Sequence, residues 1–550
     1  MTPKFPNPRV LALVAAAVLL CNSFLTAQIA HLTPKPSSGA SFRIAGTVVN
    51  ATTSQPLART QVSVTNTKDP NDGQSMVTSD DGIFHFQVKA GKYSLRGEKR
   101  GFIASAYDQH ETFWTGIVTG AGLDTENLVF RLPPAAAITG KITDEIGDPV
   151  REATITVYRE DHSTGVSRIH LLSTATTDDL GAYEVTPLSA GTYFASVAAQ
   201  PWYAVHPISS QSGAAAVDRA LDAAFSFTYY KDTTEPDDAT PIPLGPADHA
   251  EVDFHINPVP ALHLVFRGGA LPAFHSPVFE KPTFDGITVP QSGTVEQVSP
   301  GIFEITGLAP GKYTLRARSS TNGAMKEPTD VYLNHDEQDL DLSAGALTAS
   351  VKATVQVPGS TKLPSGLTIA LRNGKGRIAR AIEVNDKGEA AFTDLAPGQY
   401  DVAAGSPTKA YSVSRISREG HGINGHNLDV PAGSSLTVSL VLVGGAVTVE
   451  GFAKRSGNAA PGAMIVLVPS NPEANLELFR RDQSDQDGSF VLRQVVPGTY
   501  TILAIENGWD LDWAKPAVIE HYRQHGQKLV VGDQKGSVRL PGSVEVQPRL

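Results

Sequence analysis

Residues 484–502 read S-D-Q-D-G-S-F-V-L-R-Q-V-V-P-G-T-Y-T-I, and this stretch decides the fold. The Asp residues and Gly488 favour a tight hairpin turn, because Asp bonds its own backbone and Gly accepts the left-handed conformation. The following residues alternate between core-facing and solvent-facing types, as half-buried strands do. Pro497-Gly498 predicts a second turn. Tyr500 then starts another strand, with its ring in the core and its hydroxyl bonded to nearby backbone, as in a tyrosine corner.

This pattern occurs five times along the chain. The two turn glycines are ten residues apart in the last four copies and nine apart in the first. Because the copies recur at intervals of roughly one small domain, they indicate internal repeats of one folding unit. The tyrosines of the five copies are Tyr93, Tyr193, Tyr313, Tyr400 and Tyr500.

We therefore predict an all-β chain of tandem Ig-like β-sandwich domains after a signal peptide. The 550 residues include 49 Gly and 38 Pro, which fits many short strands joined by turns. Residues 201–248 are predicted to be an insert in the second sandwich, with a short helix over 214–227, and 514–525 is a second helix candidate. The predicted limits of the five sandwiches are 41–133, 134–258, 259–345, 346–443 and 444–550.

The N-terminus, residues 1–27, has the features of a cleavable secretory signal. Lys4 and Arg9 precede an unbroken apolar run of eleven residues, Val10 to Leu20. That run is short for a membrane span, which argues against the alternative of an uncleaved anchor. We expect cleavage after Ala27. A lipoprotein is the other alternative, because Cys21 follows the apolar run, although Leu20 stands where a lipobox has a small residue.

Charge, cysteine content and hydropathy exclude several classes of protein and of partner. The formal net charge is −11 and the chain has no basic run of five residues, so nucleic acid is not an expected partner. Cys21 is the only cysteine, so the mature chain has no disulfide and each sandwich depends on its own packed core. No later apolar run reaches spanning length. We expect a secreted or periplasmic protein without a transmembrane segment in the mature chain.

A second motif precedes several copies of the first. In the clearest case the strand Ile138 to Thr143 leads to the turn Gly147-Asp148-Pro149 and then to the strand Ala153 to Tyr158. With D-x-x-G-x-F and P-G-x-Y-x-L after it, this order resembles the carboxypeptidase regulatory-like domain, a prealbumin-like sandwich akin to collagen-adhesin B-type repeats. The resemblance is good for the first, second and fifth copies and weaker for the others. It implies an accessory, non-catalytic role, and its carbohydrate-binding-like superfamily implies sugar binding by analogy of fold.

No motif in the chain carries catalytic chemistry. The His-x-x-Glu of zinc carboxypeptidases is absent, as are Gly-x-Ser-x-Gly, phosphate-loop and dinucleotide motifs. We interpret His521 and His525 as surface residues of a helix, and Asp485 and Asp487 as turn residues rather than calcium ligands. We therefore expect no enzyme, no catalytic residue, no metal and no cofactor.

Aromatic residues outside the alternating strands are the remaining candidates for binding. We place a ligand site on the insert, around Trp202, Tyr203, Tyr229 and Tyr230, because flat apolar rings displayed on loops stack on sugars or on partner side chains. The alternative is that these rings only cover the end of the sandwich. Trp114, Trp509 and Trp513 also fall in loops, and we expect them to fold back over the core edges; the alternative is that they stay exposed and bind a sugar or a protein partner. The predicted function is a secreted or periplasmic, non-catalytic binding and spacer protein made of carboxypeptidase regulatory-like repeats, for which the resemblance implies carbohydrate as the ligand. The alternative is a structural or protein-partner module of the cell envelope.

Overall fold

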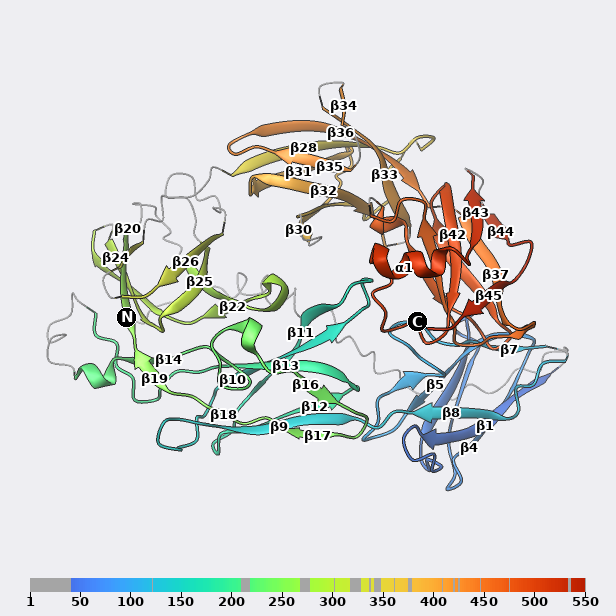
Figure 1. Ribbon diagram of the computed structural model, residues 1–550, viewed down its shortest axis with the longest axis horizontal. Helices are drawn as coiled ribbons and strands as arrows, with labels where there is room; N and C mark the ends of the chain where they lie inside the picture. The colour runs from blue at the N-terminus through green and yellow to red at the C-terminus, as the bar shows by residue number, and fades with distance from the viewer. Residues whose placement is uncertain are drawn as a thin grey trace, which may run out of the picture. The chain divides into compact units, whose positions relative to one another are not determined.

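The structure is a computed structural model, drawn in Figure 1. The predicted signal peptide, with Cys21, lies outside the residues that it describes. The described residues are 41–120, 122–208, 218–267, 277–300, 302–316, 328–335, 338–340, 348–360, 362–373, 378–407, 409–418, 421–423, 426–445, 447–473, 475–532 and 536–549.

The described residues are mostly β-strand, and their buried apolar side chains form five main cores that follow one another along the sequence. The fold is therefore all-β, with tandem Ig-like or prealbumin-like sandwiches, as predicted. We number the sandwiches 1 to 5 by these cores, and the limits between neighbours remain a prediction. The cores extend from Ile44 to Leu132, Ala136 to Ile256, Leu262 to Leu333, Ala349 to Leu442 and Val447 to Val546.

Sandwiches 1 to 3 each have two main sheets. In sandwich 1 the sheets have the strand orders β4-β1-β8 and β3-β2-β5-β6, and β7 pairs with β5. In sandwich 2 the orders are β12-β9-β17 and β11-β10-β13-β15, and β16 pairs with β13. In sandwich 3 they are β23-β24-β20-β27 and β22-β21-β25-β26. The strands are β1 (Phe42–Asn50), β2 (Gln61–Asn66), β3 (Gly73–Val77), β4 (Ile83–Val88), β5 (Gly91–Glu98), β6 (Ser105–Ala106), β7 (Ile117–Thr119), β8 (Leu128–Leu132), β9 (Ala136–Thr143), β10 (Thr154–Asp161), β11 (Arg168–Thr176), β12 (Ala182–Leu188), β13 (Gly191–Ala198), β14 (Ala223–Phe225), β15 (Thr228–Tyr229), β16 (Ile242–Leu244), β17 (His249–Glu251), β18 (Phe254–His255), β19 (Pro258–Pro260), β20 (Leu262–Arg267), β21 (Val278–Pro282), β22 (Thr288–Gln291), β23 (Thr294–Ser299), β24 (Ile302–Leu308), β25 (Gly311–Arg316), β26 (Thr329–Leu333) and β27 (Gln338–Leu340).

In sandwiches 4 and 5 the strands are linked into one continuous sheet each. The order is β30-β29-β32-β33-β36-β28-β31 in sandwich 4 and β38-β37-β45-β42-β39-β40 in sandwich 5. Their strands and the helix α1 are β28 (Ala349–Gln356), β29 (Thr368–Arg372), β30 (Ile378–Glu383), β31 (Glu389–Leu395), β32 (Gly398–Gly405), β33 (Ala410–Arg418), β34 (His421–Ile423), β35 (Asn427–Val430), β36 (Ser435–Gly444), β37 (Val447–Arg455), β38 (Asn458–Ala459), β39 (Met464–Pro469), β40 (Arg480–Gln483), β41 (Ser489–Val495), β42 (Gly498–Ile505), α1 (Pro516–Arg523), β43 (Gln527–Val531), β44 (Gly536–Arg539) and β45 (Val544–Gln547).

All five sandwiches place their first strand in the same way. The first strand pairs antiparallel with the strand after the turn motif and parallel with a strand near the end of the sandwich, as β1 does with β4 and β8. The strands β9, β20, β28 and β37 repeat this arrangement. Gly46 allows the close approach of β8, because a Cβ atom there would lie 2.0 Å from the carbonyl oxygen of Leu128.

The predicted turn and tyrosine corner are present throughout. The first turn glycine has φ between 69° and 80° in the four copies where the structure describes it. Each motif tyrosine is at most 4% exposed, and its hydroxyl donates to the backbone carbonyl four residues earlier, at 2.6–3.2 Å. In the fifth copy the acceptor is Val496 and burial raises the pKa of Tyr500 to about 12. This short contact ties each hairpin to its own sandwich.

The two helix predictions have different outcomes. Residues 516–523 form α1, within the predicted range. The helix predicted over 214–227 is wrong for the described part of that range, which contains a short 3-10 turn at Arg219–Leu221 and the strand β14, and the strand β15 follows it. The strand β15 pairs with β13, and β14 pairs with β19. Hydrogen bonding to these neighbouring strands therefore favours extended backbone over helix in this part of the insert.

Candidate functional site

The predicted aromatic site on the insert separates into two parts. Trp202 is 87% exposed, and its ring meets that of Tyr203 edge to face, with the ring centres 5.9 Å apart. The Tyr203 hydroxyl donates to Oε1 of Glu145, in the turn between β9 and β10, at 3.2 Å. The next residue in that turn, Ile146, is 76% exposed. Two exposed apolar side chains are therefore the immediate chain neighbours of this hydrogen-bonded pair.

Tyr229 and Tyr230 do not belong to that surface. Tyr229 is 1% exposed and packs with Tyr158 and Phe227 of sandwich 2 and with Phe284 of sandwich 3. Tyr230 is half-buried against Phe254 and the core of sandwich 2. Since Tyr229 is almost inaccessible to solvent, it cannot stack on a ligand in this conformation. Its role is to fill the junction between sandwiches 2 and 3.

A chain of four ionisable side chains crosses the same junction. His206 and Asp222 come from the insert, and their side chains are 3.0 Å apart. His263 of sandwich 3 bridges Asp222, at 2.6 Å, and Glu304, at 2.8 Å. Burial alone would lower the pKa of His263, but the hydrogen bonds and charges of the two carboxylates raise it above its ordinary value. The His263 imidazole thus joins the insert to sandwich 3.

Sandwich 5 contacts sandwich 1 through a buried polar turn. The Asp485 carboxylate, fully buried, accepts from the backbone N–H of Gly116 at 2.9 Å and lies 2.5 Å from the Lys92 ammonium group. The backbone N–H of Gln486 returns a hydrogen bond to the Gly116 carbonyl at 3.1 Å. Burial raises the pKa of Asp485, while the charge and hydrogen bond of Lys92 oppose that rise. The sequence predicts a turn at Asp485 but does not indicate this contact between sandwiches.

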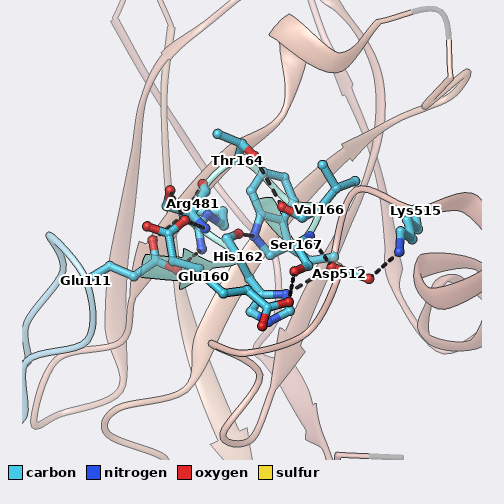
Figure 2. A network of polar contacts seen from close by, with 12 residues as sticks. Glu111, Glu160, His162, Thr164, Val166, Ser167, Arg481, Asp512 and Lys515 are labelled. Atoms are coloured by element: carbon cyan, nitrogen blue, oxygen red, sulfur yellow. Dashed lines mark hydrogen bonds and ion pairs between the residues drawn. The ribbon is translucent and has the colours of Figure 1, made fainter. Parts of the chain in front are cut away.

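Sandwich 5 also contacts the β10–β11 hairpin of sandwich 2. Figure 2 shows His162, Ser167 and Lys515 converging on the Asp512 carboxylate. Burial alone would raise the pKa of Asp512, but these three hydrogen bonds hold it below its usual value. The Ala514 N–H donates to the carbonyl of Gly165 at 2.8 Å.

Arg481 connects the three sandwiches in the same network. Its guanidinium forms two hydrogen bonds to Glu111 of sandwich 1, at 2.6 and 3.1 Å, and one to the carbonyl of Ser163 of sandwich 2, at 3.0 Å (Figure 2). It also lies 4.4 Å from the ring centre of Trp513, a cation–π contact. A bidentate Arg–carboxylate pair fixes orientation as well as contributing energy.

Trp509 and Trp513 fold back over the core, as expected. They are 9% and 7% exposed and belong to a second apolar cluster of sandwich 5. The ring of His110, from sandwich 1, stacks on Trp509 with ring centres 5.1 Å apart. Trp114, in contrast, is 39% exposed. The two buried indoles help to join sandwich 5 to its neighbours.

Two further findings concern the described residues only. No group of three or more His, Cys, Asp or Glu side chains there has the arrangement of a metal site. No helix there is long and apolar enough to cross a bilayer.

Residues 43–132 match the model of the carboxypeptidase regulatory-like domain family. Sandwich 1 is therefore a carboxypeptidase regulatory-like domain, as its motifs predicted. No curated protein sequence matches the chain.

Solved structures with similar folds have low identity to this chain. The Bacillus anthracis TIE protein is 12% identical, with 74% of this chain and 75% of that chain covered and a TM-score of 0.18. The Streptococcus agalactiae minor pilin GBS52 is 13% identical, with coverages of 42% and 99% and a TM-score of 0.21. The shaft pilin SpaA of Lactobacillus rhamnosus GG is 14% identical, with coverages of 42% and 100% and a TM-score of 0.19.

Proposed function

We propose that this chain is an exported, non-catalytic binding and spacer protein whose ligand surface is formed by Trp202 and Tyr203. The observation that carries the proposal is the 87% exposure of Trp202 beside a tyrosine that is held in place by Glu145. Leaving an indole in water is unfavourable, and exposed apolar side chains that cluster often mark interaction surfaces. A carbohydrate ring is the proposed ligand, since flat aromatic faces suit it.

The joined sandwiches supply the spacer part of this function. Polar and aromatic contacts link sandwich 5 to sandwiches 1 and 2, and the insert links sandwich 2 to sandwich 3. A binding surface on such a scaffold is oriented before the ligand arrives, which reduces the entropy lost on binding. The alternative function, a structural or protein-partner module of the cell envelope, would use the same exposed surface to contact an apolar side chain of another protein.

The substitution Trp202→Ala tests the proposal. Buried aromatic anchors in interfaces contribute about 2 kcal/mol or more, so binding to a glycan array or to an envelope protein fraction should weaken roughly 30-fold. The thermal midpoint should stay unchanged because the side chain is exposed. Trp114→Ala is the matched control, since it removes a partly exposed indole from sandwich 1, and it should leave binding intact.

The outcome of the Trp202→Ala experiment distinguishes the carbohydrate function from the protein-partner function. Selective loss of glycan binding supports the carbohydrate function, and selective loss of a protein partner supports the envelope alternative. Unchanged binding to both, or a fall in binding that only follows a fall in stability, would contradict a ligand surface at Trp202.

Export is tested separately, by sequencing the N-terminus of the protein recovered outside the cytoplasm. We expect it to begin at Gln28. An intact Met1 on exported protein contradicts cleavage, and a lipid on Cys21 replaces it with the lipoprotein alternative.

A further inference from the structure

A cavity of about 550 Å³ lies between sandwiches 4 and 5. The end of β32 and the start of β33 form one wall, and β40 and β41 of sandwich 5 form the other. Pockets for small organic ligands generally measure about 300–1,000 Å³ and often lie between domains, so this one has a suitable size and position. The Ser412 hydroxyl of sandwich 4 donates to Glu477 of sandwich 5 at 3.3 Å and joins the two walls.

The charge of the lining is opposite to that of the whole protein. The chain carries a formal net charge of −11. Two carboxylates line the cavity, Glu477 and Asp482, against five cations. The cations are Arg372, Lys409, Arg480, Arg481 and Arg493. An excess of positive charge inside a recess attracts anions more strongly than the same charge on an open surface.

Three of these cations have no carboxylate partner within ion-pair distance among the described residues: Lys409, Arg480 and Arg493. Arg481 is paired with Glu111, and Arg372 lies 3.8 Å from Asp401. Lys409 lies near the ring of Tyr411, 5.5 Å from its centre, and Arg493 is exposed on β41. The unpaired cations come from both walls, so an anion between the walls would face positive charge on two sides.

Among these three cations, the hydrogen bonds of Arg480 give the clearest evidence for an anion site. Its guanidinium donates to the backbone carbonyls of Glu477 and Phe479, each at 2.7 Å, and to the carbonyl of Gln494 at 3.1 and 3.2 Å. These neutral acceptors fix its position without neutralising its charge, and burial lowers its pKa. A buried charge is normally stabilised by an opposite charge. Arg480 is thus a preorganised cation, and although the Glu477 charge acts on it, none of the described carboxylates lies within ion-pair distance of it.

We propose that this cavity binds a small organic anion with two or more carboxylate or phosphate groups. Arg480 contacts one group from within, while Lys409 and Arg493 contact a second from opposite walls. Ala403, Ala404 and Val491 supply apolar surface for the carbon skeleton between them. The site is separate from the Trp202 surface, and the inference does not rest on the proposed function.

Calorimetric titration of the full chain with three anionic probes tests the inference. Citrate and tri-galacturonate carry carboxylates, pyrophosphate carries phosphate groups, and maltotriose is the neutral control. We expect at least one anion to bind and maltotriose not to bind at this site. A preference for pyrophosphate identifies a phosphorylated ligand. A preference for citrate or tri-galacturonate identifies a carboxylated ligand. Absence of binding for all three anions at millimolar concentration would overturn the inference.

Matched substitutions locate the site. Lys409→Gln and Arg493→Gln each remove one unpaired cation without exposing a carboxylate partner. Because a hydrogen bond to a charged group contributes substantially to binding, each should weaken the bound anion about tenfold. Arg539→Gln, an exposed residue of β44 outside the cavity, is the control and should have no effect. Equal loss in all three variants would show non-specific charge attraction and overturn the site. Trp202→Ala should not change anion binding, so failure of the proposed function and failure of this inference are distinguishable.

Discussion

Replacing Asp485 with Asn should loosen the contact between sandwiches 1 and 5 while leaving each sandwich folded. The Asp485 carboxylate is fully buried and binds the Lys92 ammonium group at 2.5 Å, the Gly116 N–H at 2.9 Å and the Ser489 hydroxyl at 3.1 Å. Asn keeps the shape of the side chain but removes the charge that Lys92 and the Gly116 N–H face. Hydrogen bonds to charged groups contribute about 1.5–3 kcal/mol. Because Lys92 is 31% exposed and recovers some hydration, we take about 2 kcal/mol as the expected loss.

Native-state hydrogen exchange measures this loss at the junction itself. Global unfolding is a poor assay here because a chain of several sandwiches is not expected to unfold in one two-state step. The amide protons of Gly116 and Gln486 each form a hydrogen bond across the junction, so they report its opening. A loss of about 2 kcal/mol corresponds to roughly 30-fold faster exchange at both amides. Amides in the core strands of sandwiches 1 and 5 should keep their protection.

Asp178 provides the matched control, because it occupies the same turn position in sandwich 2. Its carboxylate accepts from the N–H groups of Leu180 and Ala182, both in its own hairpin. Asp178→Asn should therefore affect local exchange only and leave Gly116 unchanged. Unchanged exchange of the Gly116 amide in Asp485→Asn would refute the reasoning, as would an equal change in both variants.

Three further predictions follow from buried polar groups. Tyr500→Phe leaves the Val496 carbonyl without its donor and should cost about 1–2 kcal/mol in the stability of sandwich 5. Native-state hydrogen exchange of the core amides of sandwich 5 should be correspondingly faster, and unchanged exchange there would contradict the prediction. Burial raises the pKa of Asp482 to about 6, above the ordinary 3.8, so ionisation of Asp482 destabilises the fold as pH rises from about 4 through 6. Asp482→Asn should abolish that loss and stabilise the protein by about 3 kcal/mol at pH 7.5. A thermal midpoint of the variant that shows no gain at pH 7.5 would contradict this prediction. The carboxylates of Asp222 and Glu304 raise the pKa of His263, so the contribution of His263 to stability is fully present below pH 6.5 and disappears as pH rises through the raised pKa. His263→Gln should remove this pH dependence of stability. If the thermal midpoint of the variant keeps the wild-type pH profile, His263 is not its source.

The features that could be predicted from the sequence are local ones. The hydroxyl of Tyr500 bonds a carbonyl only four residues away, so the motif contains both partners and the same geometry appears in every copy. The turn at Gly488 depends on its own φ of 80° and on nearby residues. Alternation in β4 and β41 likewise specifies which face is buried. The all-β fold follows from such signals without knowledge of distant contacts.

The candidate site depends on contacts that have no local signal. Trp202, Tyr229 and Trp513 all lie outside the alternating strands, yet Trp202 is 87%, Tyr229 1% and Trp513 7% exposed. Phe284 of the next sandwich covers Tyr229, and Arg481 packs on Trp513. Nothing in the residues around each aromatic ring indicates which neighbour will cover it. The cavity between sandwiches 4 and 5 could not be predicted from the sequence either, because its cations come from segments far apart in the chain.

The parallel pairing of first and late strands has a consequence for synthesis. Strand β1 begins at Phe42, but its partner β8 ends at Leu132, so one edge of β1 stays unpaired while the ribosome adds the residues between them. Each sandwich repeats this delay, because the strand that closes the sheet is among the last to be made. Contacts this distant in sequence form slowly, and an open strand edge invites pairing with another chain. Chains that end before Leu128 should therefore be more prone to association than chains that extend well beyond Leu132, and the same should hold while each later sandwich lacks its closing strand.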